Sequence, residues 1–301
     1  MGIPLSIDPS KHPHELYEDI DYRVFWSGWQ QCKLGQAEHA VVRDLLPPAG
    51  RRLIDIGCGF GRLADCYLDR FQQVVMFDGS LSLLQQAREN TGGRAMYVAG
   101  DLHHLPFRMS SFDGIVMVRV FHHVINSQTC LTELRRILPG GGRLVVTYRN
   151  KLYLMHVLKW LIHPTAESPF SLEPSDTETT LISHHPAYVK RLLLKTGFVD
   201  LQNRGVGVLD RLANRMGPFG RYAPTGRRAA KFFGKVLIAP WIFCRAVAGG
   251  QAALFESRNP DDIFICLVCG GNLENKAEGY TCVSCGRHYP FTDGIFDFRS
   301  S

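Results

Sequence analysis

The 301-residue chain lacks any apolar run long enough to cross a membrane as a helix. Its longest charge-free apolar stretch of note, Val236 to Cys244, has nine residues and contains a proline. Because a bilayer-spanning helix needs about 20 apolar residues, we expect no transmembrane segment. The opening residues "MGIPLSIDPSKHPHEL" also lack the apolar core of a secretory signal.

A fully disulfide-bonded chain is excluded by the cysteine count. Nine cysteines cannot all pair, and five remain if four of them bind one metal ion. Together with the missing secretory signal, this count predicts free thiols and a cytoplasmic location. The chain is 45% hydrophobic, 21% charged and 11% aromatic, which predicts a packed core rather than disorder.

Acidic residues are scarce in one segment. Between Arg204 and Arg245 there are nine basic residues and one acid, Asp210, so this segment carries +8 of a chain whose net charge is +6. The few aromatic residues before Phe232 favour a solvated helix face. The alternative is a surface for the phosphates of nucleic acid or anionic lipid, so peripheral membrane contact stays open.

Strand-like and helix-like stretches alternate along the middle of the chain. The strand-like stretches are "RLIDIG", "QVVMFD", "AMYVAGD", "FDGIVMVRV" and "RLVVTYR", and the helix-like ones are "GRLADCYLDRF", "SLSLLQQAREN" and "SQTCLTELRRIL". Ser80 is a plausible N-cap of the second helix. After an insertion the pattern resumes with a helix at "PAYVKRLLLKTG" and strands at "FVDLQNRGVGV" and "WIFCRAVA". This alternation predicts an α/β fold with a parallel sheet and helices on both faces.

A glycine loop follows the first strand, at Asp55-Ile56-Gly57-Cys58-Gly59-Phe60-Gly61. A dinucleotide fingerprint would need a glycine at position 62, where Arg62 stands. Asp78 ends the second strand, where a carboxylate can bind ribose hydroxyls, and Asp101 with Leu102 follows the third, where the pair could clamp an adenine. Together these features indicate a nucleoside-containing ligand.

In these motifs, residues 51–149 resemble class I S-adenosylmethionine-dependent methyltransferases of the type 11-like group, which includes quinone-biosynthesis C-methyltransferases. The resemblance implies S-adenosylmethionine as cofactor and a Rossmann-like, seven-stranded sheet whose final strand is antiparallel. The cofactor-binding residues that we predict are Asp55, Gly57, Cys58, Gly59, Gly61, Asp78, Gly79, Asp101, Leu102 and Arg119.

Residues after the fourth and fifth strands are the candidates for catalysis. His122 or His123 could act as a base, although in the family such a pair often packs near the adenine. Tyr148 and Asn150 could hold a substrate, and Tyr148 is also a catalytic candidate. The Asn/Asp-Pro-Pro-aromatic motif of exocyclic-amine methyltransferases is missing. A catalytically inactive S-adenosylmethionine-binding or scaffold module is the alternative function.

The chain ends with two Cys-x-x-Cys pairs, Cys266/Cys269 and Cys282/Cys285. Four thiolates at this spacing are typical of one structural, tetrahedral Zn²⁺. The module resembles the zinc-ribbon activator subunit of tRNA, ribosomal-RNA and release-factor methyltransferases. The match covers Cys266 to Leu273, Tyr280 to Gly286 and Tyr289 to Ile295. In that family the module adds a strand to its partner enzyme and stabilises it.

These observations predict four parts of the chain: residues 1–50, a helical segment over the cofactor site; 51–249, the methyltransferase domain with insertion 150–186 and basic segment 204–235; 250–262, a linker; and 263–301, the zinc ribbon. The aromatic residues Tyr17, Tyr22, Trp26 and Trp29 of the first part could cover the cofactor or pack on the sheet. The methyl acceptor is left open between RNA or a translation factor and a small or lipid-like molecule. The sequence does not determine the oligomeric state.

Overall fold

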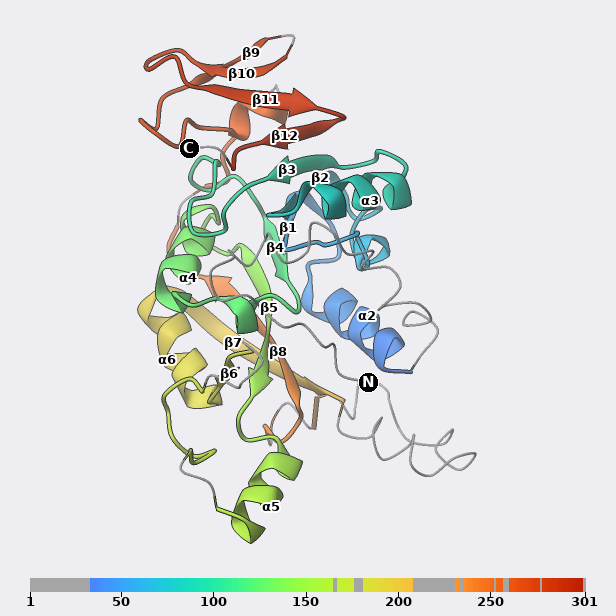
Figure 1. Ribbon diagram of the computed structural model, residues 1–301, viewed down its shortest axis with the longest axis vertical. Helices are drawn as coiled ribbons and strands as arrows, with labels where there is room; N and C mark the ends of the chain where they lie inside the picture. Colours follow the sequence, from blue (N-terminus) through green and yellow to red (C-terminus); the bar gives the residue numbers. More distant parts are fainter. Residues whose placement is uncertain are drawn as a thin grey trace.

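The structure, a computed structural model, describes residues 33–164, 167–175, 181–207, 231–232, 235, 237–251, 253–256, 260–276 and 278–299. The cysteine module lies at one end of the long axis and the helix of the insertion at the other (Figure 1). The aromatic cluster of residues 17–29 and most of the basic segment fall outside the described residues. What we expect of both stays a prediction.

Seven strands form the central sheet in the order β7-β8-β5-β4-β1-β2-β3. All are parallel except β8, which runs antiparallel to both of its neighbours. The seven-stranded sheet with an antiparallel final strand is therefore confirmed. The strands are β1 (Gly50–Ile56), β2 (Phe71–Asp78), β3 (Met96–Ala99), β4 (Gly114–Met117), β5 (Arg143–Asn150), β7 (Phe198–Val206) and β8 (Trp241–Ala248).

Helices cover both faces of this sheet, as the alternating pattern predicts. On one face pack α2 (Lys33–Leu45) and α3 (Leu81–Thr91), and on the other pack α4 (Ser127–Arg136) and α6 (Pro186–Lys195). In α4 the apolar spacing buries Cys130, Leu131 and Leu134 together. The amide of Leu83 donates to the Ser80 hydroxyl at 3.3 Å, so Ser80 is the N-cap of α3.

The helix expected directly after the glycine loop is not formed. Residues 61–70 instead make consecutive turns around a short 3-10 helix, η2 (Ala64–Cys66). Two side chains of this stretch make buried contacts. Arg62 pairs with Glu38 of α2 at 2.9 Å, and the Tyr67 hydroxyl donates to Asp55 at 2.5 Å. We attribute the loss of the regular helix to these two buried contacts, which helix propensity alone does not register.

The cysteine module continues the central sheet. Its strand β12 (Ile295–Asp297) pairs in parallel with β3, aligning Ile295 with Tyr97 and Asp297 with Ala99. The order then runs β12-β11-β10-β9, with β9 (Leu273–Lys276), β10 (Gly279–Cys282) and β11 (His288–Thr292). The module thus covers the edge of β3, which would otherwise present unpaired backbone groups.

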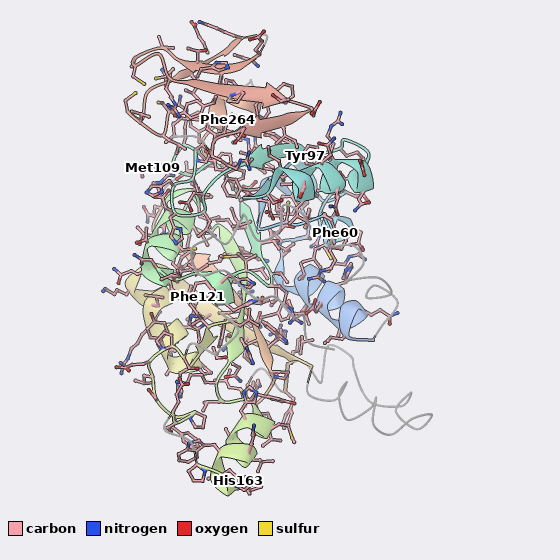
Figure 2. The ribbon with its side chains drawn as sticks, viewed as in Figure 1. Phe60, Tyr97, Met109, Phe121, His163 and Phe264 are labelled. Atoms are coloured by element: carbon pink, nitrogen blue, oxygen red, sulfur yellow. The ribbon has the colours of Figure 1, made fainter. Side chains whose placement is uncertain are left out.

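Aromatic side chains join the module to the core of the sheet. Phe264, which follows η5 (Pro260–Ile263), lies 5.4 Å from Phe107 and 5.1 Å from Phe298, measured between ring centroids. All three rings are buried, and Phe264 stands at the junction in Figure 2. The segment before it is attached as well, since the Phe255 carbonyl accepts from Arg52 at 2.8 Å. The described part of the expected linker therefore packs on the sheet.

The insertion leaves the sheet after β5 and returns to it. It contains α5 (Leu154–Ile162) and the two-residue strand β6 (Ser183–His184), which pairs with the end of β5. No helix in the described part of the chain is both long and apolar enough to cross a membrane.

Candidate active site

The glycine loop leaves the end of β1 with its backbone turned into the left-handed region. Gly57, Gly59 and Gly61 have φ values of 66°, 54° and 78°. A Cβ on Gly57 would strike Val120, so this glycine allows a close approach within the protein. A Cβ on Gly59 would meet no atom within 4 Å and would project into open space. That open backbone suits a bound ligand.

An open pocket lies beside this loop. It brings together five of the predicted cofactor residues from two parts of the sequence. These are Asp55, Gly57, Cys58, Gly59 and Arg119. Sequence reasoning missed four further lining residues, which are Phe60, Arg62, Leu63 and Val118.

Asp55 lines the pocket and is almost fully buried. Burial raises the pKa of its carboxyl to about 7, against the lowering effects of the Tyr67 hydrogen bond and of Arg62. Near neutral pH this carboxyl is therefore divided between its neutral and charged forms. A cation bound in the pocket would favour the charged form.

Asp78, at the end of β2, holds the glycine loop in place. One carboxylate oxygen accepts from the amide of Gly59 at 2.8 Å, and the other accepts from the amide of Ser80 at 3.0 Å. A carboxylate can accept further bonds, so both oxygens remain able to bind hydroxyl groups. Gly79 lies between these partners, and its carbonyl accepts from Arg299 of the cysteine module at 3.5 Å.

Asp101 and Leu102 lie in the loop after β3 and are not among the residues that line the pocket. The Asp101 carboxylate accepts from the amide of His103 at 2.9 Å, and hydrogen bonds from His103 hold the pKa of this carboxyl well below its usual range. Leu102 is half-buried against the core. A role for this pair toward an adenine stays a prediction.

A buried ion cluster adjoins the pocket, since two of its members, Arg62 and Arg119, line it. Glu38 of α2 is fully buried and bonds to both Arg119 and Arg62. Burial raises the pKa of Glu38, but the two arginines together lower it by more. The pKa of Glu38 therefore lies below its ordinary value. The Arg119 guanidinium also stacks 3.6 Å from the centroid of the Trp241 ring. A glutamate in the apolar stripe that buries Val41 and Val42 was the sequence signal for this cluster.

The predicted histidines lie in η3 (Phe121–His123), directly after β4. Their rings are 4.1 Å apart, and His122 lies 5.2 Å from Trp241. Burial lowers the pKa of His123 to about 4 and that of His122 well below its ordinary value. Both side chains are therefore neutral at pH 7.

A third histidine, His184, comes from the insertion and lies 4.9 Å from Phe121. Its side chain is completely buried, and neither ring nitrogen has a partner among the described residues. Burial lowers the pKa of His184 to about 4. Buried nitrogens of this kind usually bind a hydroxyl, an amide or a water.

Tyr148 and Asn150 of β5 lie within the protein instead of at an open surface. Tyr148 belongs to the core, and burial raises the pKa of its phenol well above the ordinary value. Asn150 donates to the carbonyls of Leu237 and Ala239 at 2.7 and 2.8 Å. It therefore fixes the start of the insertion to the chain that enters β8.

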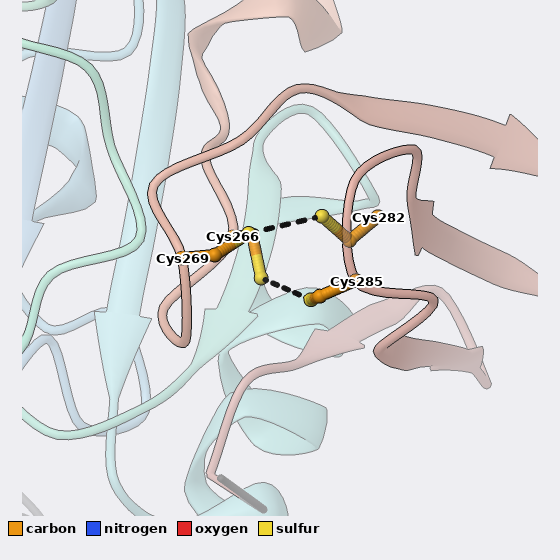
Figure 3. Close-up of side chains that lie close together, drawn as sticks. All are labelled: Cys266, Cys269, Cys282 and Cys285. Carbon is orange, nitrogen blue, oxygen red and sulfur yellow. Dashed lines mark hydrogen bonds between the residues drawn. The ribbon is translucent and has the colours of Figure 1, made fainter.

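The four cysteines of the tail converge from two hairpin tips (Figure 3). Their sulfur atoms all lie within 4.8 Å of one another, with Cys266 3.6 Å from Cys285 and Cys269 3.4 Å from Cys282. A tetrahedral zinc site with Zn–S bonds of about 2.3 Å places its sulfurs about 3.8 Å apart. The four side chains therefore fit one zinc ion, and they leave it no open position for a substrate.

Comparison with known proteins now adds to this geometry. The family described as "Methyltransferase domain" matches residues 54–146. A demethylmenaquinone methyltransferase of Clavibacter sepedonicus is 32% identical over 109 residues, which are 36% of this chain and 44% of that protein. The chain spans 40–64% of the length of the curated relatives that it matches.

Solved structures resemble the chain in fold. One is the complex between the Trm112 methyltransferase activator of Haloferax volcanii and a methyltransferase, with a TM-score of 0.53 and 19% identity over 77% of this chain and 99% of the matched one. Another is the [4+2]-cyclase SpnF, with a TM-score of 0.51 and 18% identity over 73% of this chain and 83% of that one. At these identities the likeness concerns the fold alone.

The matched residues begin inside β1, contain the glycine loop and Asp78, and end within β5, so they include every residue that lines the pocket. Residues 54–146 therefore match a methyltransferase domain, within a fold that solved methyltransferases share, and a four-cysteine module that fits a zinc ribbon follows this domain.

Proposed function

We propose that this protein transfers a methyl group from S-adenosylmethionine to a small acceptor. The observation that carries the proposal is the open pocket at the ends of β1 and β4, with Asp78 fixing the glycine loop beside it. When bound there, S-adenosylmethionine supplies a methyl group on a positively charged sulfur, which keeps the bonding electron pair when a nucleophile takes the methyl. Alignment of the reactants is therefore the main task of the protein.

The residues that would hold the cofactor have distinct chemistry. Gly57 and Gly59 let the backbone come close, and Asp78 offers oxygens to two ribose hydroxyls. By the family resemblance, Asp101 and Leu102 contact the adenine. Asp55 supplies negative charge near the cationic part of the ligand, and Arg62 and Arg119 supply positive charge for its carboxylate.

Three buried histidines, two after β4 and one from the insertion, suit an uncharged acceptor. His122, His123 and His184 are neutral at pH 7 because burial lowers the pKa of each. A neutral imidazole accepts a hydrogen bond and so orients a hydroxyl group of the acceptor. With a pKa of about 4, His123 holds a captured proton only weakly and would pass it on to water.

Aromatic side chains lie close to the same histidines. His122 contacts Trp241, and His184 contacts Phe121 and Tyr188. These neighbours, with the neutral histidines, favour a flat and weakly polar acceptor over a polyanion. The similarity to a demethylmenaquinone methyltransferase supports the same choice.

A second candidate acceptor is RNA or a translation factor. One observation favours it, which is the pairing of β12 with β3 in a chain whose fold resembles a complex with a methyltransferase activator. In either case we propose that the ribbon braces the enzyme in cis, since it completes the sheet and the aromatic core.

The decisive experiment incubates the full-length protein with S-adenosylmethionine labelled in its methyl group and fractionated cell extract. We expect label in material soluble in organic solvent, and at low cofactor concentration we expect less of it in the variant Asp78→Ala. Label in RNA or protein would replace the first acceptor class by the second. Cofactor binding by calorimetry without transfer to any fraction would leave the inactive binding module as the function.

A further inference from the structure

The cysteine module brings its last strand to the ligand-binding edge of the sheet. β12 runs parallel to β3, and β3 runs parallel to β2, so all three strands end at the same edge (Figure 1). The registers align Asp78 with Ala99, and Ala99 with Asp297. In an open parallel sheet, ligands bind beyond the carboxyl ends of the strands. The chain that leaves β12 therefore enters the region that contains Asp78.

The two residues after β12 are bonded to the neighbouring strand ends. The amide of Phe298 donates to the carbonyl of Ala99 at 2.8 Å, at the end of β3. The Arg299 guanidinium donates through Nη1 to the carbonyl of Gly79 at 3.5 Å. Because Gly79 directly follows Asp78, this second contact lies one residue from the carboxylate that we predict to bind the ribose.

The Arg299 side chain is held in place by Asp297. Its Nε and Nη2 atoms donate to the two carboxylate oxygens of Asp297 at 3.1 and 3.0 Å, and its amide donates to the same carboxylate at 3.0 Å. The side chains of Arg299 and Asp297 are only 29% and 20% exposed. A two-pronged pair of this kind fixes the direction of the guanidinium. The contact to Gly79 therefore needs little further ordering of the arginine.

Residues 297–299 are also connected to the cysteine cluster. The rings of Tyr289 and Phe298 are buried and stack with their centroids 4.6 Å apart. The Tyr289 hydroxyl accepts from the amide of Leu267 at 2.9 Å and lies 3.3 Å from the Cys266 sulfur. The position of Arg299 therefore depends on the folded module as well as on the sheet.

We propose that Arg299 is a positioning residue for the cofactor, which fixes the Asp78-Gly79 segment and thereby raises the affinity of the site for S-adenosylmethionine. Arg299 acts through Asp78, whose carboxylate also accepts from the Gly59 amide of the glycine loop. The cysteine module then contributes to cofactor binding in addition to completing the sheet. This inference rests on the proposed function, because it takes S-adenosylmethionine as the ligand.

The test is titration calorimetry of the full-length protein with S-adenosylmethionine. Arg299→Ala should weaken binding about fivefold, the factor expected for one lost hydrogen bond. Asp297→Ala releases the guanidinium and should weaken binding in the same direction. In a protein that already carries Asp78→Ala, Arg299→Ala should weaken binding by less than about twofold, because the residue through which it acts is gone. A purely structural role of Arg299 would give the same factor in both backgrounds.

The matched control is Arg108→Ala. Arg108 also joins the module to the sheet, since its guanidinium donates to the Asp262 carbonyl at 2.7 Å and to the Asn272 side chain at 2.6 Å, and neither partner belongs to the Asp78-Gly79 segment. Thermal unfolding checks that every variant folds, and Arg108→Ala should bind the cofactor as the wild type does.

Three results would overturn this inference alone while the wild type binds S-adenosylmethionine. They are unchanged affinity in Arg299→Ala, an equal loss in Arg108→Ala, and a full fivefold loss on the Asp78→Ala background. A wild-type protein without affinity for S-adenosylmethionine would overturn the proposed function as well.

Discussion

The two ends of the molecule use apolar side chains in opposite ways. At one end, Phe264 and Phe298 of the cysteine module are buried against Phe107, and β12 closes the edge of β3. At the other end, the large apolar residues of α5, here called the α5 face, stay exposed; they are Leu154, Met155, Leu158, Leu161 and Ile162. The first arrangement is that of a folded core, and the second is that of an exposed apolar surface.

This difference separates a part that is buried in the fold from a part that lies on its surface. The module at the β3 edge is continuous with the sheet that holds the cofactor pocket, so its loss should reach the enzyme itself. The insertion contacts the sheet mainly through Asn150 and the short strand β6. Changes on its outer face should therefore leave the fold intact.

The largest effect is expected from Cys282→Ser. The wild-type protein should carry about one equivalent of zinc, and the variant should carry little or none, because three thiolates bind the ion far less well than four. A module of this size has too small a core to fold without its metal, so its unfolding should expose the β3 edge and lower the melting temperature of the whole chain. Metal analysis and calorimetry measure both effects.

The matched control for this variant is Cys130→Ser, since Cys130 is a buried thiol of the core outside the module. It should keep its zinc. A Cys282→Ser protein that melts as the wild type does would show that the module folds and functions separately from the sheet.

The next largest effect is expected on the free energy of unfolding, when a substitution at one end of the molecule is compared with a substitution at the other. Phe264→Ala should lower the free energy of unfolding by about 3–5 kcal/mol, because it leaves a cavity among packed rings. Leu161→Ala should change it by less than about 0.5 kcal/mol, because this side chain is exposed. Urea unfolding of both variants gives the two values. A Leu161→Ala protein as unstable as Phe264→Ala would mean that the α5 face is covered within the molecule.

The sequence predicted the parts of the fold that local patterns determine. Alternating strands and helices predicted a parallel sheet, and the family resemblance, not a local pattern, implied that the last strand, "WIFCRAVA", is antiparallel. Ser80 was identified as an N-cap from its place before the helix. The spacing of the four cysteines predicted one metal cluster, and their sulfur atoms converge.

Contacts between distant segments could not be predicted in the same way. The expected helix at residues 61–71 was wrong because Arg62 and Tyr67 find buried partners in α2 and β1. The role of Glu38 needed the fold, since only packing of α2 brings it to Arg62 and Arg119. The exposure of the apolar side of α5 could not be predicted either, because the apolar spacing of α5 is that of an ordinary buried helix.

A smaller effect is expected at the cofactor pocket between the two ends. Asp78→Ala should weaken S-adenosylmethionine binding by about 1–3 kcal/mol, because it removes a charged acceptor and frees the Gly59 amide. Titration calorimetry measures the change. Asp69→Ala serves as the control, since Asp69 is an exposed carboxylate paired with Arg94 at 2.9 Å, and its loss should leave affinity unchanged. An unaltered affinity in Asp78→Ala would remove Asp78 from the site.

The smallest effect concerns the pH dependence of that binding. Burial raises the pKa of Asp55 to about 7, so its carboxyl gains negative charge as the pH rises from 6 to 8. S-adenosylmethionine carries a sulfonium charge that S-adenosylhomocysteine lacks. The ratio of their affinities should therefore shift toward S-adenosylmethionine across this range, by at most about tenfold per pH unit. The Asp55→Asn variant should show only the titration of the ligands themselves.

The same carboxyl gives an independent measure in the free protein. Because the pKa of Asp55 is raised from an ordinary value of 3.8, the folded state binds more protons than the unfolded state between about pH 4 and pH 7. Its contribution to the free energy of unfolding therefore falls as the pH rises through this window. Urea unfolding at several pH values should show this slope in the wild type and lose it in Asp55→Asn. If the slope is present but the affinity ratio stays flat, Asp55 is a buried acid of the fold that does not face the charged end of the cofactor.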